Sequence, residues 1–324
     1  MRIANDVTEL IGNTPLVRIR KLGREGGAQI VAKLEFHNPA HSVKDRIGLA
    51  MIEAAEASGQ LRPGMTIVEP TSGNTGLGLA LAALIKGYKL ICTATTKISQ
   101  EKVRMLEAHG AEVITCPVDV DAQDPRSYYK VAERIRDEQG AFLPYQYFNQ
   151  ANPEAHYRST GPEIWRQTDG KVTHFVAGVG TGGTISGVAR YLKEQNPAVR
   201  IVGVDPVGSI YAYFSEHGVL PPADQLKVYL IDGIGQSYVP ESYWPQYIDD
   251  VITVDDRTAY REVFELTRRE GIFTGSSGGA AAFAARQVAA AAGDDDIVVT
   301  LLPDSGERYL SKLNDDWMGE RGLL

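Results

Sequence analysis

The sequence has few cysteines, no long apolar run and no excess of basic residues. Cys92 and Cys116 are the only two cysteines among 324 residues, and a chain this long needs no disulfides to bury a core. Two buried free thiols in a reducing compartment are therefore expected. The longest apolar stretch, residues 77–85, is far shorter than the roughly 18 residues of a membrane span, and the N-terminus lacks the apolar segment of a signal peptide. These features predict a cytoplasmic protein without a membrane partner.

Acidic residues outnumber basic ones along the chain. There are 41 Asp and Glu against 33 Lys and Arg, which gives a formal net charge of −8 at pH 7. Nucleic-acid-binding proteins usually carry a basic patch, and no run of Lys and Arg predicts one here, so no nucleic-acid partner is expected. The six histidines do not point to a ligand cluster either, and we expect no metal site.

Short β-branched runs alternate with helical patterns in two parts of the chain, without any repeat of fixed period. Strands connected by helices form parallel sheets that are covered on both faces. The predicted fold class is α/β, with two open, twisted, mostly parallel sheets flanked by helices. Strands are predicted at 66–69, 89–92, 112–115, 174–177, 200–204 and 297–302, and helices at 45–58, 75–86, 99–109, 183–194 and 255–270.

Two turns at predicted strand ends are rich in glycine and hydroxyl side chains. The first, TSGNTG at 71–76, leads into the helix at 75–86, and the second, GVGTGGT at 178–184, leads into the helix at 183–194. Amides and hydroxyls that converge on a helix N-terminus bind carboxylates and phosphates. Both turns are candidate anion sites, although ordinary capped turns without a ligand have a similar composition.

The glycines of the second turn also fit the G-x-G-x-x-G spacing of dinucleotide-binding turns. Asp205 ends the next predicted strand, 22 residues after Gly183, where a nicotinamide enzyme carries an acidic residue. A nicotinamide-dependent dehydrogenase is therefore one alternative. Thr181 and Thr184 favour another ligand, because their hydroxyls and the turn's amides form a compact cup for one phosphate monoester.

Lys44 stands at the predicted start of a helix, after a turn that contains Pro39. Most lysines in such a position are simply solvated. However, a positive helix N-terminus disfavours a lysine cation and favours the neutral amine, which is the form that attacks a carbonyl. Lys44 is thus the candidate nucleophile.

Taken in order, these segments resemble the fold-type II pyridoxal-phosphate enzymes, and among them the cysteine synthase/cystathionine β-synthase family. The resemblance covers nearly the whole chain. It implies a fold like that of the tryptophan synthase β-subunit and pyridoxal 5′-phosphate as cofactor. The matching segments are IGNTPLV at 11–17, SVKDR at 42–46, TSGNTG at 71–76, GTGGT at 180–184 and PDSGERY at 303–309.

The resemblance implies a role for each matching residue. Lys44 would bind the cofactor covalently and act as the base that moves the Cα proton. The other cofactor-binding residues would be Asn74 at the 3′-oxygen, Gly180, Thr181, Gly182, Gly183 and Thr184 at the phosphate, Gly235 beside the ring, and Ser277 at the pyridine nitrogen. The substrate-binding residues would be Thr71, Ser72, Thr75 and Gln146 at the α-carboxylate, together with Tyr147 and Asp232.

Several positions favour the cystathionine branch of this family. Tyr147 stands where cysteine synthases usually carry Phe, and Asp232 stands where they tend to have a neutral residue. A carboxylate at 232 would pair with the amino group of homocysteine, which sulfide lacks; otherwise it is a solvated loop acid. The expected reaction joins L-serine or O-acetyl-L-serine to L-homocysteine to form L-cystathionine. The segment SGERYL at 305–310 instead resembles cysteine synthases, so synthesis of L-cysteine from O-acetylserine and sulfide is the alternative.

The resemblance also implies an organisation into two domains. We expect a large cofactor-binding domain over 1–43 and 150–324, and a smaller mobile domain over 44–149 that carries the carboxylate-binding turn. A homodimer is expected, with neither haem nor a regulatory domain pair. Some cysteine synthases accept the C-terminal peptide of serine acetyltransferase in their active site, so a non-catalytic, partner-binding member of this fold is a further alternative.

Overall fold

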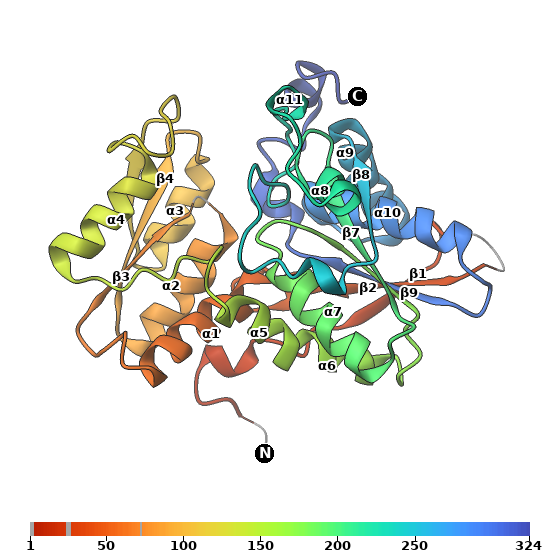
Figure 1. The fold of residues 1–324 in the computed structure, drawn as a ribbon, viewed down its shortest axis with the longest axis horizontal. Helices are drawn as coiled ribbons and strands as arrows, with labels where there is room; N and C mark the ends of the chain where they lie inside the picture. The colour runs from red at the N-terminus through yellow and green to blue at the C-terminus, as the bar shows by residue number, and fades with distance from the viewer. Residues whose placement is uncertain (1–2, 24–26, 72) are drawn as a thin grey trace. The chain divides into compact units, whose positions relative to one another are not determined.

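The computed structural model describes residues 3–23, 27–71 and 73–324 (Figure 1). These residues form two compact units, each with its own parallel sheet. Unit 1 lies within 1–11 and 38–152, and unit 2 lies within 12–37 and 153–324. The predicted α/β class with two mostly parallel sheets is confirmed. Among the described residues, no helix is both long and apolar enough to cross a bilayer.

Unit 1 contains a three-stranded parallel sheet in the order β3-β4-β5, with helices packed against it. Strands β3 and β4 are nearly continuous buried runs, which is typical of parallel strands. Helix α3 begins at Ser99, whose side chain accepts a hydrogen bond from the N–H of Lys102. The elements are η1 (Val7–Leu10), α1 (Lys44–Ala57), β3 (Thr66–Pro70), α2 (Asn74–Lys86), β4 (Lys89–Thr95), α3 (Gln100–Ala108), β5 (Glu112–Cys116) and α4 (Tyr128–Gln139).

Both cysteines lie in this sheet, Cys92 in β4 and Cys116 in β5. Each is a free, buried thiol, as the sequence predicts. Burial raises the pKa of Cys92 to about 12, so this thiol stays protonated at neutral pH and is a poor nucleophile.

Unit 2 contains a six-stranded sheet in the order β1-β2-β9-β6-β7-β8. Among the strand pairs of this sheet that the structure describes, only β1 and β2 are antiparallel. The alanine-rich helix α10 packs against β2, β6, β7, β8 and β9. The elements, with α5 beginning in the last residues of unit 1, are β1 (Leu16–Ile19), β2 (Gln29–Leu34), η2 (Glu35–His37), α5 (Ala151–Arg158), α6 (Thr160–Gln167), β6 (His174–Gly178), α7 (Gly183–Gln195), β7 (Arg200–Pro206), α8 (Tyr211–His217), η3 (Ala223–Gln225), η4 (Pro245–Tyr247), β8 (Asp250–Val254), α9 (Asp256–Glu265), η5 (Leu266–Glu270), α10 (Ser276–Ala291), β9 (Ile297–Leu302), η6 (Gly306–Tyr309) and α11 (Asp315–Gly319).

The helix predicted over 255–270 differs in its last turn. It is α-helical only to Glu265, continues as the π-helical turn η5, and ends at Gly271 with φ of 72°. Because a left-handed residue at this position favours glycine, the end of the element is encoded locally. No local sequence signal predicts the change from α to π geometry after Glu265.

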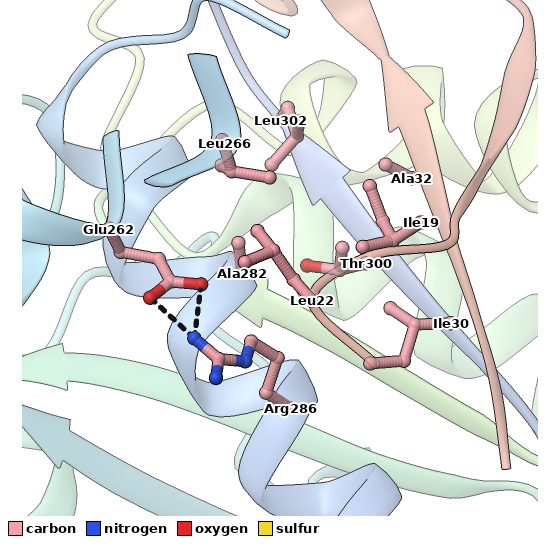
Figure 2. Close-up of a pocket in the computed structure, with 10 residues that line it drawn as sticks. All are labelled: Ile19, Leu22, Ile30, Ala32, Glu262, Leu266, Ala282, Arg286, Thr300 and Leu302. Carbon is pink, nitrogen blue, oxygen red and sulfur yellow. Dashed lines mark hydrogen bonds and ion pairs between the residues drawn. The ribbon is translucent and has the colours of Figure 1, made fainter. Parts of the chain in front are cut away.

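A small apolar cavity lies in unit 2 between the first strands and helices α9 and α10 (Figure 2). It is too narrow to admit a water molecule. Thr300 in β9 lines it, and the buried Oγ1 of Thr300 has no hydrogen-bond partner among the described residues. The ion pair between Glu262 and Arg286 forms one wall, with Nη1 of Arg286 at 2.8 Å from Oε2 of Glu262.

Replacing Thr300 with valine is expected to raise the free energy of unfolding by about 1 kcal/mol. Valine has nearly the same shape, and it removes a buried hydroxyl that is desolvated without compensation. The matched control is Thr93→Val in β4, because Thr93 is equally buried but its hydroxyl donates to the carbonyl oxygen of Tyr128 at 2.7 Å. That control should lower stability. Urea unfolding of both variants measures the difference, and two shifts of the same sign would contradict this account.

Candidate active site

Helices α1 and α2 of unit 1 approach each other closely through two glycines. A Cβ on Gly48 would overlap the backbone of Gly78, and a Cβ on Gly78 would overlap the carbonyl group of Lys44. Glycine is therefore required at both positions. This packing brings the first turn of α1, where Lys44 is the first residue, against the N-terminal half of α2.

The turn before α1 is held by a buried carboxylate. Asp45 accepts a hydrogen bond from the N–H of Ala40 at 2.5 Å, and the N–H of Lys44 donates to Oγ of Ser42 at 3.2 Å. Asp45 is fully buried, whereas Lys44 is half-buried. The backbone at Lys44 is thus fixed while its side chain retains access to solvent.

The turn at 71–76 lies at the N-terminus of α2. Thr71 and Thr75 are buried, and no acidic residue stands in the first turn of this helix. Oγ1 of Thr75 donates to Oε1 of Gln146 at 2.6 Å, although the two residues are 71 positions apart. The structure thus brings together three of the four predicted carboxylate-binding residues in a setting that suits an anion. The fourth, Ser72, lies outside the described residues.

The turn at 180–184 leads into α7 in unit 2 and tolerates only glycine at two positions. A Cβ on Gly180 would overlap the carbonyl oxygen of Gly233, and Gly182 has φ of 86° with Tyr243 directly beside it. The N–H of Gly235 donates to the carbonyl oxygen of Val179 at 2.8 Å. The predicted phosphate turn and the predicted ring-contacting glycine therefore lie side by side.

Hydroxyl groups from distant segments fix the peptide planes of this turn. Tyr211 donates its hydroxyl to the carbonyl oxygen of Gly180 at 2.5 Å, and Ser242 donates to that of Thr181 at 2.7 Å. Both come from the stretch 206–250, which has little regular secondary structure. With these carbonyls bonded within the protein, the turn keeps one conformation before any ligand binds.

His156 supports the end of the same turn. It is fully buried, with Nε2 at 3.2 Å from Oγ1 of Thr184 and Nδ1 at 2.8 Å from Oγ1 of Thr160. A buried histidine bonded to two hydroxyls inside the protein orients the hydroxyl of Thr184.

Ser277 and Asp232 complete the group in unit 2. Oγ of Ser277 lies 3.9 Å from the position that a Cβ on Gly233 would occupy. The N–H of Asp232 donates to Oγ of Ser276 at 3.0 Å, and the Asp232 carboxylate pairs with Nζ of Lys312 at 2.6 Å. Asp232 is therefore a half-buried carboxylate, paired with Lys312, next to the glycine loop.

The residues of unit 2 fit the phosphate end of pyridoxal phosphate. Helix α7 has no acidic residue in its first turn, and Thr181 and Thr184 supply hydroxyls beside its N-terminus. Glycines at 180 and 182 occupy positions where a side chain has no room. A helix N-terminus with this composition is an anion site, and a single phosphate monoester matches its size.

Asp205 does not fit the nicotinamide alternative. It is fully buried, and its Oδ2 accepts a hydrogen bond from the N–H of Ala212 at 3.1 Å, at the start of α8. Desolvation raises the pKa of Asp205 to about 6. Its other oxygen, Oδ1, is buried and has no hydrogen-bond partner among the described residues. A carboxylate without exposed surface is not presented to the ribose of a dinucleotide, which disfavours the nicotinamide alternative.

The sequence does contain one H-x-x-x-H spacing, formed by His37 and His41. His37 ends the short helix η2, whereas His41 lies in the following turn with φ of 58°. The two residues therefore do not share one helical face. Across the described ranges, no three His, Cys, Asp or Glu side chains gather where they could hold a metal ion.

Sequence reasoning misses the residues that support the site. Glu69, Tyr211, His156 and Lys312 all bond to predicted site residues or to the backbone of a site loop. Only Glu69 carries a local signal, as a charged residue inside the otherwise apolar strand TIVEP. Of the predicted site residues, unit 1 holds Lys44, Thr71, Asn74, Thr75, Gln146 and Tyr147, and unit 2 holds Gly180, Thr181, Gly182, Gly183, Thr184, Asp232, Gly235 and Ser277.

Comparisons with known proteins agree with this geometry. The family model described as "Pyridoxal-phosphate dependent enzyme" matches residues 7–304. The chain is 43% identical to cystathionine β-synthase of Oryctolagus cuniculus over 327 residues and 42% identical to that of Dictyostelium discoideum over 324 residues. These matches cover 100% and 99% of this chain but 59% and 64% of the relatives, so the chain spans less than two thirds of their length.

Solved structures give a similar result. An O-ureido-L-serine synthase superposes with a TM-score of 0.89 at 33% identity, covering 98% of this chain and 100% of that one. A hydrogen sulfide-producing enzyme from Fusobacterium nucleatum superposes with a TM-score of 0.86 at 36% identity, covering 96% and 99% respectively.

Proposed function

The chain belongs to the family of pyridoxal-phosphate dependent enzymes, and from this premise we propose that it joins L-serine or O-acetyl-L-serine to L-homocysteine, forming L-cystathionine. The observation that carries the choice of acceptor is the Asp232–Lys312 ion pair beside the glycine loop. An amino-acid acceptor needs charged partners for its amino and carboxylate groups, whereas sulfide needs none. The names of the relatives from Oryctolagus and Dictyostelium support the same reaction.

We propose the following roles for the chain's residues. Thr71, Thr75 and Gln146 bind the α-carboxylate of the donor at the N-terminus of α2. Nζ of Lys44 removes the Cα proton and returns it once the thiol has added at Cβ. Bound pyridoxal phosphate supplies an electron sink conjugated with Cα.

On the cofactor side, we propose that residues 180–184 hold the phosphate, that Asn74 donates to the 3′-oxygen, and that Ser277 faces the pyridine nitrogen. A hydroxyl at that nitrogen does not hold it protonated as a carboxylate would. The ring is then a weaker electron sink, and this favours loss of the β-substituent over transamination.

Cysteine synthesis from O-acetylserine and sulfide is the second candidate. The likeness to a hydrogen sulfide-producing enzyme supports sulfur chemistry with a smaller partner. Cofactor-loaded protein given serine, O-acetylserine, homocysteine and sulfide at equal concentrations separates the two, with products identified by mass spectrometry. Dominant cystathionine supports the proposal, and dominant cysteine contradicts it. Isotopically labelled serine identifies the donor.

Replacing Asp232 with asparagine is expected to raise the KM for homocysteine about tenfold, because the variant loses one charge-assisted hydrogen bond to the amino group of homocysteine. The KM for sulfide should stay unchanged, because sulfide carries no amino group. Asp249→Asn is the matched control, since Asp249 forms a comparable, partly exposed ion pair with Lys193 at 2.7 Å elsewhere in unit 2. Steady-state kinetics with each acceptor provides the measurement. Equal changes for both acceptors would show that Asp232 does not select between them.

We also propose that the protein is a homodimer and works in a reducing compartment. The exposed apolar side chains Leu10, Leu84 and Ile85 lie on η1 and α2, which pack together in unit 1, and such a face suits a partner subunit. The free thiols Cys92 and Cys116 suit a reducing compartment. Light scattering at known protein concentration tests the dimer. The mobility of residues 44–149 stays a prediction.

A further inference from the structure

Glu69 is a carboxylate buried inside the sheet of unit 1. It stands in β3, two residues before Thr71, and has no exposed surface. Its Oε2 accepts a hydrogen bond from the N–H of Tyr145 at 2.7 Å, and its Oε1 accepts one from the N–H of Gln146 at 3.1 Å. Both carboxylate oxygens are thus used on two consecutive amides of one loop.

The loop that Glu69 holds has an unfavourable backbone conformation. Tyr145 has φ of 56°, in the left-handed region that residues with a side chain rarely adopt. Such a conformation persists only where the surroundings enforce it. The carbonyl oxygen of Tyr145 accepts hydrogen bonds from Phe148 and Asn149 at 2.9 and 3.1 Å, so the loop is fixed from both sides of this residue.

The loop in turn sets the position of the Gln146 side chain. Oε1 of Gln146 accepts a hydrogen bond from Thr75 at 2.6 Å, and its backbone carbonyl accepts one from Nδ2 of Asn152 at 2.9 Å. A continuous chain of bonds therefore runs from Glu69 through Gln146 to Thr75. All of these residues belong to unit 1.

Burial raises the pKa of Glu69 to about 7, against the opposing effect of the two amides. The titratable groups that face it are Cys92 on β4 and Tyr145 on the loop, and desolvation raises the pKa of each to about 12. Glu133 on α4 accepts from the Tyr145 hydroxyl at 3.2 Å and pairs with Lys130. Ionised Glu69 accepts both amide bonds well, whereas protonated Glu69 has one carbonyl oxygen and one hydroxyl, which is a weaker acceptor.

We propose that Glu69 is a positioning residue for the donor's α-carboxylate: its ionised side chain holds the 145–146 amides and so keeps Gln146 against Thr75. It does not touch substrate or cofactor itself. The inference rests on the proposed function only in placing the donor carboxylate at residues 71–75. Ionised Glu69 opposes folding at neutral pH, because its pKa is higher in the folded protein than in the unfolded chain. The contribution of Glu69 to the free energy of unfolding therefore increases as the pH falls from above 7 toward 4.5, the ordinary pKa of a glutamate.

The test compares Glu69→Gln with wild type between pH 6 and 8 in the cofactor-loaded protein. At pH 8 the donor KM of the variant should be about tenfold higher than that of wild type, the loss of one charge-assisted hydrogen bond. At pH 6 the ratio should approach one, because wild-type Glu69 is then largely protonated. Using the ratio cancels the ionisation of the donor's own amino group. The corresponding ratio for the acceptor KM should stay near one at both pH values.

Glu133→Gln is the matched control, because it removes a carboxylate bonded to the hydroxyl of Tyr145 while leaving both amide bonds to Glu69 intact. Its donor KM should follow wild type at every pH. A donor KM ratio near one for Glu69→Gln at pH 8, or equal increases for donor and acceptor, overturns the proposal.

Amide hydrogen exchange gives a second readout that requires neither turnover nor a stable variant. In substrate-free wild type, protection of the Tyr145 and Gln146 amides should fall about tenfold between pH 8 and pH 6 after correction for intrinsic rates. Constant protection overturns the role of Glu69. If exchange behaves as expected but no donor is turned over, the proposed function fails and the role of Glu69 in holding the loop stands.

Discussion

Lys44→Ala is expected to lower turnover by at least about 10⁴-fold, since it removes both a covalent attachment point and a general base. The reason lies in the packing of unit 1. Gly48 and Gly78 allow the first turn of α1, which begins at Lys44, to pack against the N-terminal half of α2, the helix at whose N-terminus the donor carboxylate is proposed to bind. No conservative replacement restores an amine at that point; Arg does not lose its proton in proteins.

The loss should appear in spectra as well as in rates. Wild type loaded with pyridoxal phosphate should show a visible absorbance band, and borohydride reduction should leave a cofactor-sized mass on the peptide that contains Lys44. The variant should show no such labelled peptide. Near-wild-type turnover, or a label on another lysine, would contradict the assignment.

Lys86→Ala is the matched control for this experiment. Lys86 ends α2 in the same unit and forms an ion pair with Glu56 at 2.8 Å. It is partly exposed and lies at the opposite end of the helix from residues 71–76. Its replacement should change stability by less than about 1 kcal/mol and leave turnover and labelling as in wild type.

The sequence predicts the parts of the fold whose signals are local. Strands β6 and β9 are short apolar runs bounded by turns and helices, and both glycine-rich turns follow strands as expected. The inner strand β2 is missed, because Gln29 and Lys33 interrupt its apolar run. Strand β1 is missed because two of its four residues are exposed, and β8 is missed because its single buried residue comes last. Edge strands carry too little apolar periodicity to be distinguished from loops.

In the candidate site, too, some residues carry a local sequence signal and others do not. Gly180 and Gly182 are found because their spacing itself encodes a turn that excludes side chains. Lys312 is 80 residues from its partner Asp232, and Tyr211 is 31 residues from Gly180. Such contacts arise only when the sheet brings the loops together. The residues proposed to face the ligands therefore carry local sequence signals, whereas most of the groups that hold them in place do not.

Lys33→Met is expected to lower the free energy of unfolding by about 3–5 kcal/mol, the cost of leaving one member of a buried ion pair without its partner. Lys33 in β2 has no exposed surface. Its ammonium group donates to Oε2 of Glu163 at 2.6 Å, to the carbonyl oxygen of Thr14 at 2.7 Å and to Oε1 of Gln167 at 2.9 Å. All three of its donors are thus satisfied.

The consequence for Glu163 decides the size of the effect. Its other oxygen accepts a hydrogen bond from the N–H of Asn13 at 2.9 Å, and Asn13 has φ of 47°. Without Lys33 the buried carboxylate keeps this bond but loses its counter-charge. Adding Glu163→Gln to Lys33→Met should therefore recover more than half of the lost stability, because the amide oxygen still accepts from Asn13 and carries no charge.

Urea unfolding of the single and double variants measures both effects, with Lys130→Met as the matched control. Lys130 forms an ion pair with Glu133 at a similar distance, 2.7 Å, but both side chains are partly exposed, so the loss should stay below about 1 kcal/mol. A double variant as unstable as Lys33→Met would show that lost packing, and not the unpaired charge, dominates. Recovery would instead assign a structural role to the IGNTPLV segment, because the buried Lys33–Glu163 pair holds Asn13 and Thr14. The resemblance of this segment to the family's sequences would then reflect the folding of unit 2 more than contact with a ligand.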